Sequence, residues 1–259
     1  MSSSRNHTRV ILTRPAPQSQ AWQTALIEAG FDVALLPLID ITLLPPPPLL
    51  PELSAYNAIF LVSRNALDGL LAWYGIDALQ KAPVRWLCPG TGTAQQLIEL
   101  GIASQHITCP APDTPQDTQH LWQTLQNTHP IHPEQKILVI KGCDLGQTAQ
   151  PNWLARQVQQ LGAQAQELIT YQRQAPNITV AQAELAISAA QDGSIWLFSS
   201  SLAVEHLHQA LPEIRFQATP CIATHARIAQ TAMQYGFVAH ICQPQLNDIA
   251  HMLHQMQAT

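Results

Sequence analysis

The chain has 259 residues, 46% hydrophobic and 11% charged, so it can bury a core without staples and is not disordered, collagen-like or a coiled coil. Its 12 Lys and Arg against 17 Asp and Glu give a net charge of −5, which excludes a global positive field for nucleic acid or an anionic membrane. Five scattered cysteines without CxxC spacing, and a polar start without an apolar leader, favour a reduced, cytoplasmic protein with no membrane span.

Short β-branched runs recur along the chain, each followed by a polar turn and a segment of helical period. This alternation predicts βα units on parallel sheets. The first strand, 10–13, leads through Arg14 into a helix that ends at Gly30, and a second strand follows the glycine. Segments 58–71 and 84–102 each predict a further strand and helix.

The second half repeats these three units in the same order. Segment 137–162 matches the first unit, with Lys141 in the place of Arg14 and Gly162 in the place of Gly30. Segments 194–207 and 219–237 align on the second and third units. A repeat of domain length over most of the chain predicts a duplicated small α/β domain, not a solenoid.

Two domain divisions fit this repeat. Sequence order alone suggests a cut at 129–133, between the two copies. The alternative is an interleaved pair of domains, joined where the extended, proline-stiffened stretch 36–51 and the matching stretch 169–176 cross between them.

The sequence Gly90-Thr91-Gly92-Thr93 joins a predicted strand to a helix. Glycines there would let the backbone approach an anion at the first helical N–H groups. An ordinary tight turn with Thr93 as a helix-start hydroxyl is the alternative. The turn has neither the Lys of a P-loop nor the third glycine of a dinucleotide fingerprint, which disfavours nucleotide binding.

Ser63 and Ser199 end matching strands, each before a helix. A serine there is first of all an N-cap, and a capped helix start at the carboxyl edge of a parallel sheet can also bind carboxylate or phosphate. No GxSxG elbow surrounds either serine, which argues against a hydrolase.

Two cations and one tyrosine complete the set of candidates. Arg14 and Lys141 stand at equivalent strand ends, where they either are solvated or contact an anion. Tyr171, whose repeat partner is Ile39, either packs in a strand or gives a proton. No metal site is expected, because the His251 and His254 pair lacks a third ligand.

The chain resembles the uroporphyrinogen-III synthase family over nearly its whole length. The resemblance rests on the order and spacing of VILTRP, LLPLI, FLVSRNAL, GTGTAQQL, ILVIKG, LITYQR, WLFSSS and ATHARIAQTA. It implies two similar parallel-sheet α/β domains joined by a two-stranded linker, one inserted into the other. The expected division is 1–37 with 175–259, and 38–174.

The resemblance also implies a lyase of tetrapyrrole (porphyrin and haem) biosynthesis. Such an enzyme cyclises hydroxymethylbilane to uroporphyrinogen III, inverting the terminal pyrrole ring and losing water, without a cofactor. Tyr171 matches the family's tyrosine and is the expected catalytic residue. The expected substrate-binding residues are Arg14, Ser63, Arg64, Gly90, Gly92, Thr93, Lys141 and Ser199.

The expected partner is one small molecule, a linear tetrapyrrole with eight carboxylates, bound by a monomer. A non-catalytic two-domain module that binds or senses a small anion is the competing hypothesis, since it would share a two-domain, hinged fold. The second-copy turn departs from the family pattern, with Ile228 opposite Thr93, and this leaves the role of His225 open.

Overall fold

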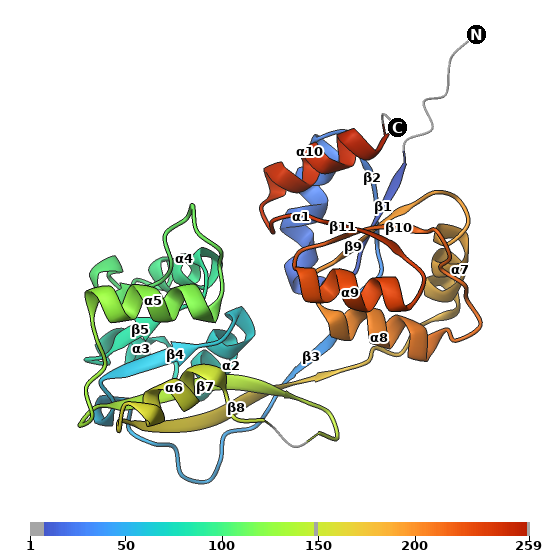
Figure 1. Cartoon of the computed structure of the whole chain (residues 1–259). Coiled ribbons are helices and arrows are strands. Elements are labelled where there is room, and N and C mark those ends of the chain that lie inside the picture. Colours follow the sequence, from blue (N-terminus) through green and yellow to red (C-terminus); the bar gives the residue numbers. More distant parts are fainter. Residues whose placement is uncertain (1–7, 148–149, 258–259) are drawn as a thin grey trace. The chain divides into compact units, whose positions relative to one another are not determined.

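A computed structural model describes residues 8–147 and 150–257. The chain divides into two compact units: the first holds the chain up to Asp40 and from Gln174 onward, and the second is Ile41–Arg173. The second unit is therefore inserted into the first (Figure 1). This confirms the expected fold class, and the alternative cut at 129–133 is wrong, because those residues connect a helix and a strand inside the second unit.

The first unit is built on a parallel sheet with the strand order β11-β10-β9-β1-β2. Its strands are β1 (Arg9–Leu12), β2 (Asp32–Leu35), β9 (Ile195–Phe198), β10 (Pro220–Ala223) and β11 (Val238–Ile241). Its helices are α1 (Ala16–Glu28), α7 (Val180–Ala189), α8 (Ser201–Ala210), α9 (Ala226–Gln234) and α10 (Leu246–Gln257). Helices α1 and α10 pack together, as do α8 and α9, so helices cover the sheet (Figure 1).

The second unit has a larger sheet with the order β3-β8-β7-β4-β5-β6. The strands are β3 (Asp40–Leu43), β4 (Ala58–Leu61), β5 (Arg85–Leu87), β6 (Ile107–Thr108), β7 (Lys136–Asp144) and β8 (Gln164–Gln174). The helices are α2 (Arg64–Tyr74), α3 (Ile76–Lys81), α4 (Thr91–Glu99), α5 (Thr118–Thr128) and α6 (Trp153–Gln160), with short 3-10 turns η1 (Leu53–Ala55) and η2 (Ser104–His106). All the strand pairs from β8 to β6 are parallel.

The sheet orders confirm the repeat and show how its copies are shared out. In the first unit the order is β2-β1-β9-β10, and in the second it is β8-β7-β4-β5. The first sheet therefore joins β1 and β2 of the first copy to β9 and β10 of the second, and the second sheet joins β7 and β8 of the second copy to β4 and β5 of the first. The two units have the same topology because the copies exchange their first strand-helix-strand segments.

Strand β4 shows why these sequences form central strands. Ala58 and Phe60 belong to the core on one sheet face, and Ile59 and Leu61 to the core on the other. Alternate residues face opposite sides, so a strand covered on both faces reads as a continuous apolar run. No helix of the described ranges is long and apolar enough to cross a membrane.

The segments between strands include both expected and unexpected features. Gly30 and Gly162 have φ values of 92° and 81°, as expected of glycines just past a helix. The chain passes between the units at Asp40–Ile41 and at Arg173–Gln174, so the crossings fall within the expected stretches 36–51 and 169–176, but beyond β3 the prolines lie on the second unit. There the Trp73 indole N–H donates to the Leu44 carbonyl at 2.7 Å, and the Tyr74 hydroxyl donates to the Pro51 carbonyl at 2.7 Å.

Candidate functional site

The hydroxyls of Ser63 and Tyr171 form a 3.0 Å hydrogen bond within the second unit. Ser63 is the N-cap of α2, and its Oγ also accepts a hydrogen bond from the backbone N–H of Ala66 at 3.3 Å. Tyr171 is only 4% exposed and its ring belongs to the core. Two residues singled out separately in the sequence thus form one hydroxyl pair, which follows the carboxyl end of β4.

Two glycines make this pair possible. A Cβ on Gly142 would lie 2.3 Å from Cε2 of Tyr171, so the ring occupies the space that any other residue at 142 would fill. A shift in the pairing of β7 with β8 between Lys141 and Gly142 brings Gly142 opposite Tyr171. A Cβ on Gly69 would lie 2.5 Å from the side chain of Thr170, so α2 also packs closely on β8.

Neither Gly142 nor Gly69 stands out in the sequence. Neither stands in a glycine-rich motif, and each contact joins residues far apart in the chain. The one sequence signal is that each is an isolated glycine, Gly142 inside a strand pattern and Gly69 inside a helix pattern. Such glycines often mark a bulge or a close approach of another segment.

The Gly90–Thr93 turn is shaped by protein contacts. Helix α4 begins at Thr91, after Gly90 with φ −163°, an extended conformation that any residue adopts. The Arg64 guanidinium donates through Nε to the Gly92 carbonyl at 3.2 Å, and a Cβ at Gly92 would lie 2.7 Å from its Nη2. The close approach expected at Gly92 is therefore made by Arg64.

The first backbone N–H of α4, which has no acceptor within the helix, also has a protein partner. The backbone N–H of Thr91 donates to Oε1 of Gln116 at 2.8 Å, and the Gln116 amide donates to the carbonyls of Ala111 and Thr114. Nothing in the pattern around Gln116 marks this residue in a chain rich in glutamine. The Thr91 N–H is thus engaged by this side chain, and an incoming anion would have to displace Gln116.

Asp117 fixes the end of the loop that carries Gln116. Its carboxylate caps α5 by accepting from the His120 backbone N–H at 2.8 Å. Burial acts to raise the pKa of Asp117, but the hydrogen bonds from His120 outweigh it and hold this pKa below its usual value.

Thr93 is not the helix-start hydroxyl that the turn interpretation assumed. It is the third residue of α4, is 6% exposed, and follows a cap without a side chain at Gly90. The equivalent residue in the second copy, Ile228, is also the third residue of its helix and is also 6% exposed. His225 is the N-cap there, its Nδ1 accepting from the Arg227 backbone N–H at 3.2 Å.

Lys141 is neither a solvated surface cation nor an open anion contact. Its side chain is 7% exposed and forms an ion pair with Glu167 on the neighbouring strand. Its ammonium also donates to the Gln150 carbonyl, and Glu167 accepts from the Asn152 backbone N–H at 2.6 Å. The charge of Lys141 is thus already balanced by Glu167, and the side chain ties β7 and β8 to the start of α6.

We expect Lys141→Met to lower the free energy of unfolding by about 3 kcal/mol, because it leaves Glu167 largely buried without its cation. Denaturant unfolding measures the loss, and the double variant Lys141→Met/Glu167→Gln should recover most of it. The Michaelis constant KM of the folded Lys141→Met protein should be unchanged. A raised KM with normal stability would restore Lys141 as an anion contact.

In the first unit, Arg14 and Ser199 lie after neighbouring strands β1 and β9. The Arg14 guanidinium carbon lies 4.0 Å from the centre of the Trp22 ring, a cation–π contact. Ser199 is not the N-cap of its helix: α8 is capped at Ser200, whose side chain makes no capping hydrogen bond. The alignment of 194–207 on 58–71 is therefore one residue out of step with the start of α8.

Within the described ranges, no group of three or more His, Cys, Asp or Glu residues could hold a metal ion. The His254 ring lies on Phe31, with centroids 4.6 Å apart. His251 contacts Gln255 at 3.0 Å. Both members of the histidine pair on α10 have partners that explain them without a metal.

Solved structures of similar fold are uroporphyrinogen III synthases. The enzyme of Helicobacter pylori matches with a TM-score of 0.60 and 15% identity, over 96% of this chain and 99% of that one. A mutant of the enzyme from the extremely thermophilic bacterium Thermus thermophilus matches with a TM-score of 0.51 and 15% identity, over 97% of this chain and 99% of that one. At this identity these likenesses establish the two-domain α/β fold.

The sequence supplies what the fold alone does not. A family model described as uroporphyrinogen-III synthase HemD matches residues 20–253, which is most of the chain. The match contains the whole second unit, with the hydroxyl pair, and the first unit apart from the residues before 20 and after 253. The chain belongs to the uroporphyrinogen-III synthase family.

Proposed function

We propose that the Ser63–Tyr171 pair assists the loss of the hydroxyl from hydroxymethylbilane, the linear tetrapyrrole that this family cyclises to uroporphyrinogen III. The observation that carries the proposal is the 3.0 Å bond between the two hydroxyls at the carboxyl edge of the sheet. Ligands of open α/β sheets bind beyond that edge. Tyr171 is buried and Ser63 is half-buried, so Ser63 is the better exposed member of the pair.

The reaction sets two tasks for these residues. The hydroxyl must leave as water, which needs a proton, and the pyrrole N–H gives up a proton as the azafulvene forms, which restores the donor. The terminal pyrrole then attacks the azafulvene through its substituted carbon. The spiro intermediate then fragments and recloses with that ring inverted. Substrate becomes product plus water without net oxidation or reduction, so proton delivery and geometry are the tasks left to side chains.

In the proposed proton path, one of the two hydroxyls donates its proton to the departing oxygen, and the other donates to the first hydroxyl. Ser63 can accept from Tyr171 while its own proton points to the substrate, or the order can be reversed, because either atom can be the donor. The Ala66 N–H bond keeps the serine oxygen in place in both arrangements. Deleting either hydroxyl would break the same path.

We propose that Arg14, Arg64 and Ser199 contact the carboxylates of the substrate, and that the Gly90–Thr93 turn holds Arg64 in place. The protein is net negative and has 12 Lys and Arg in all, so individual cations at strand ends count for more than usual. Arg64 is exposed and held by the Gly92 carbonyl, which leaves donors of its guanidinium for a ligand. We further propose that the enzyme acts in the cytoplasm as a monomer, without nucleic acid.

Gly92→Ala should raise KM roughly 3- to 20-fold with little change in the catalytic constant kcat, because the new methyl displaces Arg64, one charged hydrogen-bonding partner. Its stability should hold, since alanine favours helix and the displaced group is the mobile end of an exposed side chain. Steady-state kinetics beside Arg64→Gln checks this, and both variants should give the same KM. A normal KM for both would remove Arg64 from the substrate contacts.

The experiment that tests the function is isomer analysis after mixing the purified chain with hydroxymethylbilane. Unaided closure gives the uninverted isomer, so a dominant uroporphyrinogen III product identifies the enzyme. A sensor or anion-binding module would bind the tetrapyrrole and leave only the uninverted isomer. That result would overturn the proposal.

A further inference from the structure

A pocket lies at the edge of the second unit's sheet that is opposite the Ser63–Tyr171 pair. Its volume is about 250 Å³, and its walls include Ala58 and Arg85, the first residues of β4 and β5, and Ile137 near the start of β7. The Ser63–Tyr171 pair follows the carboxyl end of β4. The pocket is therefore at the amino ends of the strands and shares none of the residues assigned to the reaction.

One part of the pocket is apolar. Its floor is the closed core between α5 and the sheet, where Leu87, Leu125 and Ile137 are at most 2% exposed. The apolar surface that a ligand can reach comes from the exposed Pro130 and from Ile131, and a hydrocarbon lying over them would remove that surface from water.

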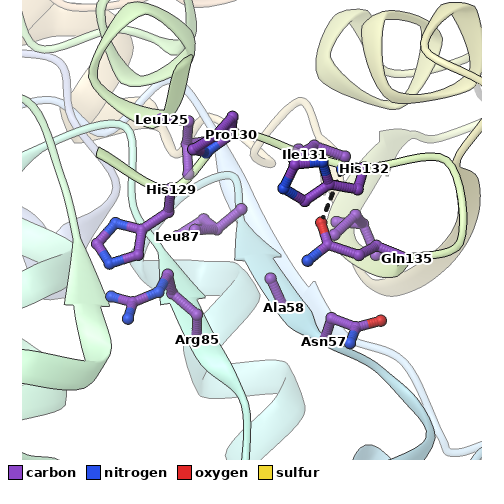
Figure 2. Close-up of a pocket in the computed structure, with 11 residues that line it drawn as sticks. Asn57, Ala58, Arg85, Leu87, Leu125, His129, Pro130, Ile131, His132 and Gln135 are labelled. Carbon is purple, nitrogen blue, oxygen red and sulfur yellow. Dashed lines mark hydrogen bonds between the residues drawn. The ribbon is translucent and has the colours of Figure 1, made fainter. Parts of the chain in front are cut away.

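The rim of the pocket is basic. Figure 2 shows the Arg85 guanidinium and the His129 ring on one side, and His132 beside Gln135 on the other. No Asp or Glu is among the residues that line it. The rim thus carries one permanent positive charge and two imidazoles, without a carboxylate to balance them.

Arg85 is held in place from one end. Its Nη1 donates to the Gln105 carbonyl and to the Thr108 hydroxyl, both at 3.3 Å. Within the described part of the chain it forms no ion pair with a carboxylate. A guanidinium fixed through one nitrogen keeps its remaining donors in a fork that matches a carboxylate.

We propose that this pocket is a second binding site, for a small carboxylic acid with an apolar body. The carboxylate pairs with Arg85 at the rim, and the hydrocarbon lies on Pro130 and Ile131. The volume is below the range of about 300–1,000 Å³ usual for drug-sized ligands, which favours an acid of roughly 6–10 heavy atoms.

The test uses sodium hexanoate as probe and the isotope-labelled whole chain observed by NMR. We expect saturable shifts at the backbone amides of Ala58 and Ile131. Arg85→Gln should weaken the affinity roughly 10-fold, as for loss of one charge-assisted hydrogen-bonding partner, and Arg85→Lys should keep part of it. Lys136→Gln removes an exposed cation that lines a neighbouring pocket and should leave the affinity unchanged.

Other outcomes would overturn the proposal. They are unsaturable shifts, equal affinity in wild type and folded Arg85→Gln, and binding of hexanol as tight as that of hexanoate, which would leave the charge without a role. Equal binding of acetate and hexanoate would leave the apolar surface without one. Arg85→Gln should keep the cyclisation rate of wild type, because the pocket is apart from the hydroxyl pair.

Discussion

Tyr171→Phe is expected to lower kcat roughly 10- to 1,000-fold while the protein stays folded, a range from one hydrogen bond to a full general-acid contribution. The substitution keeps the ring in the core and removes only the hydroxyl that contacts Ser63 at 3.0 Å. Uroporphyrinogen III should still dominate among the enzymatic products, because ring inversion depends on how the substrate is held. The measurement is the rate and the isomer ratio of the folded variant.

The matched control is Tyr56→Phe. Tyr56 is also a nearly buried tyrosine of the second unit, but its hydroxyl donates to Gln166 at 2.6 Å, away from the Ser63–Tyr171 pair. Its loss should leave kcat unchanged. A Tyr171→Phe protein with the kcat of wild type would make Tyr171 a packing residue, and loss of inversion at a normal rate would make it a guide of conformation.

Gly142→Ala is expected to reduce kcat at least as much as Tyr171→Phe does, and to lower the free energy of unfolding by about 1–3 kcal/mol. The new methyl would lie 2.3 Å from the Tyr171 ring, which is packed in the core and has no free space to enter. Either the ring moves away from Ser63 or β7 and β8 separate. Denaturant unfolding and steady-state kinetics report the two effects.

A second glycine separates strain from displacement. Gly146→Ala lies in the turn after β7, where φ is 75° and a Cβ would meet nothing within 4 Å. It should lose some stability through backbone strain and keep the kcat of wild type. If both glycine variants kept kcat, the position of the Tyr171 ring would not matter for turnover.

Much of the fold could be predicted from the sequence because its signals are local or repeated. Apolar runs of strand length, the glycines after helices and the two copies gave the strands, the helices and the parallel sheets. The residues alone do not decide whether the copies exchange segments or form two consecutive domains. Strand pairing is not local, and only the family resemblance favoured the interleaved arrangement.

The site was less predictable because its contacts join distant residues. Ser63 and Tyr171 were each candidates, but their hydrogen bond depends on a pairing shift at Gly142 and on the packing of α2 at Gly69. The ion pair of Lys141 could not be predicted either, because its partner, Glu167, comes from the neighbouring strand. Helix α8 begins one residue later than the alignment predicts, so its cap is Ser200 and not Ser199. An alignment of apolar residues cannot resolve a shift of one residue.

In the proposed proton path Ser63 and Tyr171 act as one unit. The direct test is the kcat of Ser63→Ala/Tyr171→Phe beside both single variants, each verified as folded. Residues on one proton path are not additive, so we predict that the double variant is about as slow as the slower single variant. A double variant slowed by the product of the two single effects would show that the hydroxyls act independently and would contradict the proposed path.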